Sequence, residues 1–163
     1  MKKIWIFFAI FFLSYRAMGQ DKNQLNEMIV LSLNTYIEHI HDWMDKGVVV
    51  KEQTCHHYVC RDGLPTNFPF DSLKNITFFS VYFFRAYSNS NPLKKQLGKG
   101  IGALFVSFGL ENNQLQITVS SKNVKLANGN QINVGLSDWG VYTYEYFCES
   151  KEWELKEIQY GGI

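Results

Sequence analysis

The sequence is short of charge and of cysteine, and each shortage excludes a class of protein. Charged residues make up 19% of the 163 positions and hydrophobic residues 46%. A disordered chain needs the reverse balance, so the composition predicts a folded protein. Lys and Arg number 16 against 15 Asp and Glu, and this balance predicts no nucleic-acid partner. With three cysteines, at most one disulfide can form within the chain.

Familiar catalytic patterns are also missing from the sequence. No Gly-x-Ser-x-Gly, His-Glu-x-x-His or EF-hand spacing occurs anywhere in the chain. No segment repeats at a fixed period, and no composition shift marks a boundary between two domains. The sequence therefore favours a non-enzymatic protein with one globular domain, and it predicts no cofactor.

A hydrophobic run long enough to cross a membrane is absent, although a shorter one lies near the N-terminus. Ile4–Leu13 contains ten apolar residues, whereas a spanning helix needs about 20. Lys2 and Lys3 precede this run, and Ala17 and Gly19 follow it as small residues at positions −3 and −1 of a cleavage site. This order is typical of a secretory signal peptide, and an uncleaved anchor is the alternative.

Cleavage after Gly19 would divide the chain into a signal peptide, residues 1–19, and a single globular α+β domain, residues 20–163. Loss of Lys2, Lys3 and Arg16 would change the net charge from +1 to −2. We expect an exported protein, periplasmic or secreted, with no membrane span after signal cleavage.

The first part of the mature chain reads as one long amphipathic helix over residues 21–46, and Gly47 is its expected stop. Apolar residues three and four positions apart form a continuous stripe along it. The stripe contains Leu25, Met28, Ile29, Leu33, Tyr36, Ile37, Ile40, Trp43 and Met44.

From Ile76 the hydrophobic period changes from that of a helix to that of a strand. The Asn128-Gly129 pair predicts a tight hairpin, because both residues tolerate a positive φ. In the last strand the alternation slips by one residue, which predicts a bulge near Lys156-Glu157. The segment 92–100 reads as a polar connection. The expected strands cover residues 76–87, 104–110, 115–119, 124–126, 132–136, 139–148 and 153–160, of which some join.

These elements predict an α+β fold, in which one long N-terminal amphipathic helix packs on a bent, mostly antiparallel sheet of five to six strands. The arrangement resembles the general shape of cystatin-like and cone-shaped folds. Because this is an analogy of shape alone, it implies no function.

One cluster combines the residue types that bind zinc or copper. Cys55, His56, His57 and Cys60 lie within six residues, and thiolate with imidazole is the ligand set of such ions. The spacing fits poorly, because adjacent histidines on a strand point to opposite faces. A thiol-dependent reaction would use the same residues, although no helix N-terminus is predicted beside either cysteine.

The competing interpretation is that two of the cysteines form a disulfide, because the compartments that receive exported proteins are oxidising. The candidates are Cys55, Cys60 and Cys148. A Cys55–Cys60 bond would close a short local loop, and a Cys60–Cys148 bond would close a long one. The sequence leaves both pairings open.

Aromatic residues provide the candidate binding face. Tyr142, Tyr144 and Tyr146 alternate along one strand, with Trp139 before them and Trp153 in the next strand. Tyr and Trp are common at binding interfaces, and they are equally common in the core of a sheet. The sequence thus predicts a small exported non-enzymatic binding module. It would restrain a protein partner or hold a small apolar ligand between helix and sheet, and the metal or thiol protein is the alternative.

Overall fold

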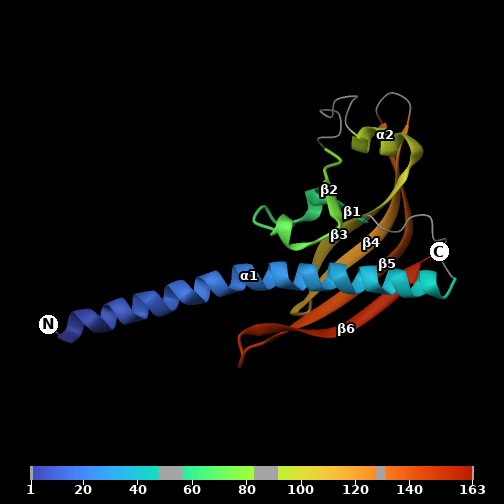
Figure 1. The fold of residues 1–163 in the computed structure, drawn as a ribbon. Coiled ribbons are helices and arrows are strands. Elements are labelled where there is room, and N and C mark those ends of the chain that lie inside the picture. Colours follow the sequence, from blue (N-terminus) through green and yellow to red (C-terminus); the bar gives the residue numbers. More distant parts are fainter. Residues whose placement is uncertain (1, 48–56, 83–91, 128–130, 163) are drawn as a thin grey trace.

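A single long helix and one sheet dominate the structure, which is a computed structural model that describes residues 2–47, 57–82, 92–127 and 131–162. Helix α1 (Lys2–Asp45) lies across the sheet, and its N-terminal half extends well beyond the sheet edge (Figure 1). The predicted α+β class is confirmed, as is the long N-terminal helix. No helix in the described part of the chain has a stretch both long and apolar enough to span a membrane.

The sheet is mixed, and the described residues form six of its strands in the order β2-β1-β3-β4-β5-β6. Strands β3 to β6 are joined antiparallel, as predicted, whereas β1 is parallel to both β2 and β3. The sequence pattern did not predict these parallel pairs, because parallel neighbours need long connections rather than tight turns. The strands are β1 (His57–Cys60), β2 (Ile76–Phe79), β3 (Ile101–Glu111), β4 (Gln114–Ala127), β5 (Gln131–Phe147) and β6 (Glu152–Gly162).

In the described part of the chain, each face of the sheet carries one α-helix. Along β3, Leu104 and Val106 belong to the hydrophobic cluster under α1, whereas Ile101 and Ala103 belong to a second cluster with Leu97 of α2 (Pro92–Lys99). Because neighbouring residues of a strand point to opposite faces, α1 and α2 cover opposite sides. The sheet therefore has an α1 face and an α2 face.

The segment predicted as a polar connection forms α2, which corrects that expectation. Pro92 is its first residue, a position where the missing N–H costs nothing, and Gly100 ends it with a φ of 95°. Eight residues are too few to be helical alone. Leu97 is fully buried against the sheet. This tertiary contact stabilises a helix that the local hydrophobic periodicity does not predict.

Two local irregularities of the strands bear on the predictions. The pairing of β5 with β6 passes from Thr143 and Glu157 directly to Tyr144 and Leu155, so Lys156 is the extra residue of the predicted bulge. A second bulge, which the sequence did not predict, lies in β5 opposite Ser121 and Lys122. The Asn128-Gly129 turn itself lies outside the described residues, although β4 and β5 pair antiparallel on both sides of it.

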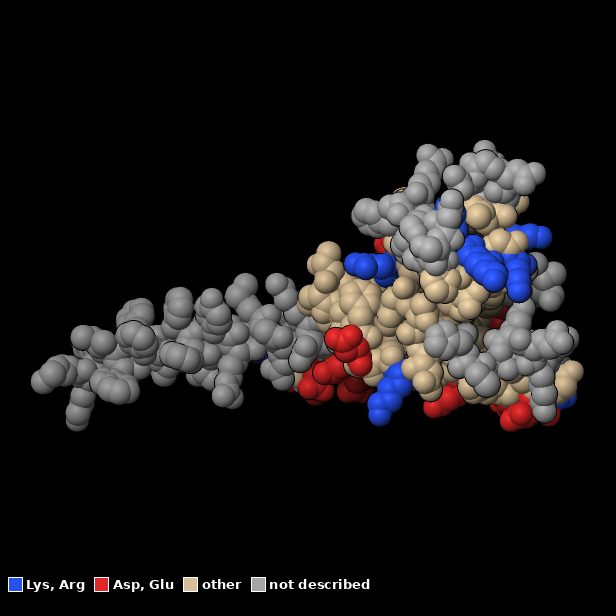
Figure 2. Space-filling view, turned by 45° about the horizontal axis from the view of Figure 1, so that its top comes forward, with Lys and Arg blue, Asp and Glu red and all other residues tan. Residues whose placement is uncertain are grey.

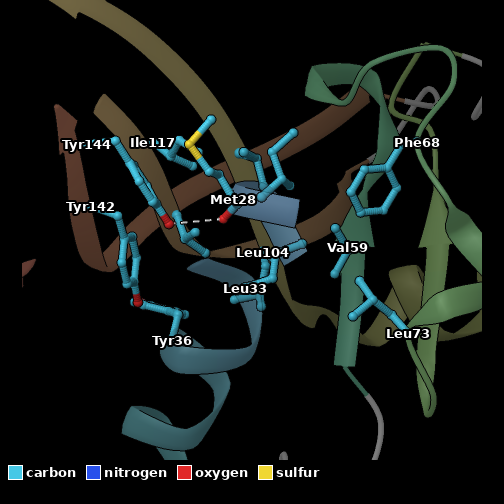
Figure 3. Packing of buried hydrophobic residues seen from close by; sticks show 13 residues of the cluster. Met28, Leu33, Tyr36, Val59, Phe68, Leu73, Leu104, Ile117, Tyr142 and Tyr144 are labelled. Carbon is cyan, nitrogen blue, oxygen red and sulfur yellow. Dashed lines mark hydrogen bonds between the residues drawn. The ribbon is translucent and has the colours of Figure 1, made fainter. Parts of the chain in front are cut away.

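The main core lies between α1 and the strands. Met28, Leu33 and Tyr36 of α1 pack against Tyr142 and Tyr144 of β5 (Figure 3). The predicted apolar stripe of the helix is thus confirmed as its buried face. Towards β1 the cluster continues through Val59, Phe68, Leu73 and Leu104.

Candidate functional site

The structure separates His57 and Cys60, the two described residues of the predicted Cys/His metal site. Cys55 and His56 lie outside the described residues. His57 begins β1 and Cys60 ends it, and the odd spacing of three places their side chains on opposite faces of the sheet. Within the described ranges, no group of three or more His, Cys, Asp or Glu side chains is placed to hold a metal ion.

Cys60 occupies a buried, protonated position. Its thiol donates to Asp62 Oδ2 at 3.6 Å, and burial raises the pKa of the thiol to about 11. The same carboxylate oxygen accepts the backbone N–H groups of Val81 at 2.6 Å and Tyr82 at 3.3 Å. A nucleophilic cysteine needs a lowered pKa, so this environment suits a structural role better than a thiol-dependent reaction.

The candidate Cys60–Cys148 disulfide is not formed. Both residues are free thiols, Cys60 buried and Cys148 exposed just after β5. The order of the sheet explains this, because β3 and β4 lie between β1 and β5. Three strand spacings amount to about 14 Å, about twice the Cα separation that a disulfide tolerates. The free thiol of Cys60 also leaves the Cys55–Cys60 bond unformed, although Cys55 itself lies outside the described residues.

A pair of histidines that the sequence pattern did not single out comes together instead. Nε2 of His41, near the end of α1, lies 3.2 Å from Nε2 of His57 at the start of β1. His39, two residues earlier on the helix, points elsewhere and stacks on Tyr160 with ring centroids 3.6 Å apart. The two histidines are 16 positions apart in the chain, and the packing of α1 beside β1 brings them together.

The tyrosine stripe is divided between core and surface. Tyr142 and Tyr144 are fully buried beneath α1, whereas Tyr146 is 38% exposed. The Tyr144 hydroxyl donates to the Met28 carbonyl at 3.2 Å and lies 3.0 Å from Ser32 Oγ. Burial raises the pKa of the Tyr142 and Tyr144 hydroxyls, so both remain neutral. These two side chains are core residues in this structure.

A glycine allows the helix to approach β5 closely. An added Cβ at Gly140 would lie 3.0 Å from the ring of Tyr36 and 3.1 Å from the ring of Tyr160. Two residues before Gly140 on the same strand, Asp138 accepts a hydrogen bond from the Tyr36 hydroxyl through its Oδ2 at 2.7 Å. Desolvation and this carboxylate raise the pKa of Tyr36 well above its usual value. The arrangement joins helix and sheet and leaves no reactive phenolate there.

The two tryptophans of the predicted binding face do not share a face. Trp139 lies on the α2 face, where its ring covers the backbone of Gly161. Trp153 lies on the α1 face, with its ring centroid 5.3 Å from that of Tyr146. Of the five residues in the predicted stripe, the structure therefore brings together Tyr146 and Trp153 as a pair near the surface.

Exposed apolar side chains lie towards the end of the sheet beside Tyr146. Phe108 and Leu110 of β3 are 41% and 73% exposed, and Leu155 of β6 is 38% exposed. Cross-strand pairing places them close in register, because Leu110 pairs with Leu115, Leu115 with Tyr144, and Tyr144 with Leu155. We call Phe108, Leu110, Tyr146 and Leu155 the open end of the α1 face.

Acidic residues lie at the same end of the sheet, on its other face. Glu145 and Glu154 are directly opposite each other on β5 and β6, and Lys156 at the bulge reaches Glu145 Oε2 at 2.6 Å. Glu111 and Glu152 lie at the same end of the sheet. On the face seen in Figure 2, basic side chains gather near α2, which contains Lys94, Lys95 and Lys99. By strand alternation these four acids project from the α2 face, on the side of the sheet opposite to the open end.

Comparison with protein-family models, with curated protein sequences and with solved structures finds no significant match to this chain.

Proposed function

We propose that the protein is a small, exported, non-enzymatic binding module that docks a protein partner at the open end of its α1 face. The observation that carries the proposal is the exposure of Phe108, Leu110, Tyr146 and Leu155 at one end of the sheet. Exposed apolar groups with a polar surround mark interaction sites in many proteins, and aromatic side chains are enriched there.

A protein partner is favoured over a small apolar ligand held between helix and sheet. Hydrogen bonds join α1 and β5 directly across that interface, from the Tyr144 hydroxyl to the Met28 backbone carbonyl and from the Tyr36 hydroxyl to the Asp138 carboxylate. A ligand there would have to separate these contacts. The open end requires no such rearrangement.

Site-specific photocrosslinking in cells that express the protein tests the docking surface. A benzophenone side chain is introduced at Leu110 or Tyr146, with Tyr82, which is 84% exposed on another part of the surface, as the matched control. The proposal expects one adduct of the same mass from Leu110 and Tyr146 and none from Tyr82. No adduct, or equal adducts from all three positions, would contradict it.

Export is tested in the same cells by fractionation and mass measurement. The proposal expects the protein outside the cytoplasm with Gln20 as its first residue. An intact chain that begins at Met1 and stays in the cytoplasm would refute the proposal that the protein is exported. The proposed docking surface would then still be judged by the crosslinking experiment.

A further inference from the structure

The pair formed by His41 and His57 has the geometry of a metal chelate. Both rings present the same nitrogen, and the two Nε2 atoms are 3.2 Å apart. The ring centroids are 5.3 Å apart with an angle of 33° between the planes, so the rings converge at their nitrogen edges rather than stack.

This separation matches what a transition ion requires. Zinc binds imidazole nitrogen at about 2.0–2.1 Å, and a tetrahedral angle between two such bonds places the nitrogens about 3.4 Å apart. Neutral imidazole is a good ligand for zinc, copper and nickel and a poor one for magnesium. We propose that His41 and His57 form a two-histidine site for a divalent transition ion.

The surroundings allow an ion to enter from solvent. His41 is exposed and His57 is half-buried. Asp42, the neighbouring acid on α1, forms an exposed ion pair with Lys46 at 2.5 Å. His39 is held against Tyr160 and takes no part.

A bound ion would connect two elements that meet only in the folded protein. His41 belongs to α1 and His57 to β1, the strand at the centre of the parallel pairs. The unfolded chain does not hold the two imidazoles 3.2 Å apart, so the ion binds the native state preferentially and raises its melting temperature. The site is independent of the open end and of the proposed docking function.

The test uses the full chain without an affinity tag, because a histidine tag would itself bind the metal. Zinc affinity is measured by competition with a chromophoric chelator, and melting temperature is measured with and without zinc. We expect saturable binding of one zinc and a rise in melting temperature, with no rise in magnesium. His41→Gln and His57→Gln should each lower the zinc affinity at least tenfold and abolish the rise.

His39→Gln is the matched control, since it removes a histidine from the same helix and should leave the zinc affinity unchanged. His41 is exposed, so His41→Gln should retain the native circular dichroism spectrum. An affinity that is equal in wild type and His41→Gln, or an absence of saturable binding in the wild type, would overturn the proposal.

A second set of variants separates this site from the contiguous Cys/His cluster of the sequence. The Cys55→Ser/Cys60→Ser chain and the His56→Gln chain should retain the zinc affinity of the wild type. Loss of zinc binding in either, with retention in His41→Gln, would assign the metal to the cluster instead. A simple N–H···N hydrogen bond between the two rings predicts no zinc-dependent change in melting temperature at all.

Discussion

Strand β5 carries three tyrosines at alternate positions, and it runs through two regions of the sheet in which these tyrosines differ in burial. In the closed region, under α1, Tyr142 and Tyr144 are fully buried and their hydroxyls have partners within the protein. At the open end, two residues further on, Tyr146 is 38% exposed and packs on Trp153. The comparison teaches that the position of the helix, rather than the strand pattern, decides which aromatic residues are core and which are available to a partner.

The largest expected contrast comes from the same substitution made in both regions. Leu33 of α1 is fully buried and Leu110 of β3 is 73% exposed. Leu33→Ala should lower the free energy of unfolding by about 2–5 kcal/mol, because it removes buried methyl groups and leaves a cavity. Leu110→Ala should change it by less than about 0.5 kcal/mol. Urea denaturation of both variants measures the difference, and similar losses would show that the open end is part of the core.

A glycine pair tests how closely the helix approaches the sheet. Gly140→Ala places a Cβ 3.0 Å from Tyr36 and 3.1 Å from Tyr160, and this overpacking should cost about 1–3 kcal/mol. Gly109→Ala, on β3, meets Gln116 only at 3.9 Å and should be tolerated. Thermal unfolding compares the two. If Gly140→Ala were as stable as Gly109→Ala, α1 would not contact β5 as closely as described.

Removal of one tyrosine hydroxyl in each region should give a smaller difference in the free energy of unfolding. Tyr144→Phe removes the bond to the Met28 carbonyl and should lower the free energy of unfolding by about 1 kcal/mol. Ser32 Oγ still donates to the same carbonyl at 2.8 Å, so no acceptor is left without a donor. Tyr146→Phe serves as the control and should be neutral to stability. A loss for Tyr146→Phe equal to that for Tyr144→Phe would contradict the division of the stripe.

The smallest effect is expected from a surface ion pair beside the bulge, on the face opposite to the open end. Lys156 bonds Glu145, and the two side chains are 50% and 39% exposed. Lys156→Gln should cost at most about 1 kcal/mol, and added salt should reduce that loss because exposed ion pairs are screened. Denaturation at low and high ionic strength provides the measurement. A loss that persists at high salt would mean that Lys156 contributes by packing at the bulge.

Much of the fold follows from local patterns in the sequence. The apolar stripe from Leu25 to Met44 predicts the buried face of α1, and the slip in alternation near Lys156 predicts the bulge. Both succeed because period and phase are local properties of the chain. The parallel position of β1 and the helix α2 were missed because each depends on neighbours far away in the sequence.

The candidate sites were less predictable than the fold. The tyrosines were identified as a stripe, but the point at which burial gives way to exposure depends on where α1 crosses β5. The Cys/His cluster was identified by adjacency in sequence, and strand alternation then separated His57 from Cys60. The histidine pair was missed because His41 and His57 become neighbours only when α1 packs beside β1.

The sequence by itself determined the α+β class, the stripe on the long helix, the antiparallel strands and the bulge, since each arises from residue periodicity along the chain. The tertiary structure alone decided three matters: which tyrosines are buried, that Cys60 and Cys148 stay apart as thiols, and that two imidazoles meet. The physical reason is that burial and side-chain proximity depend on strand order and helix placement, which are set by contacts between distant segments.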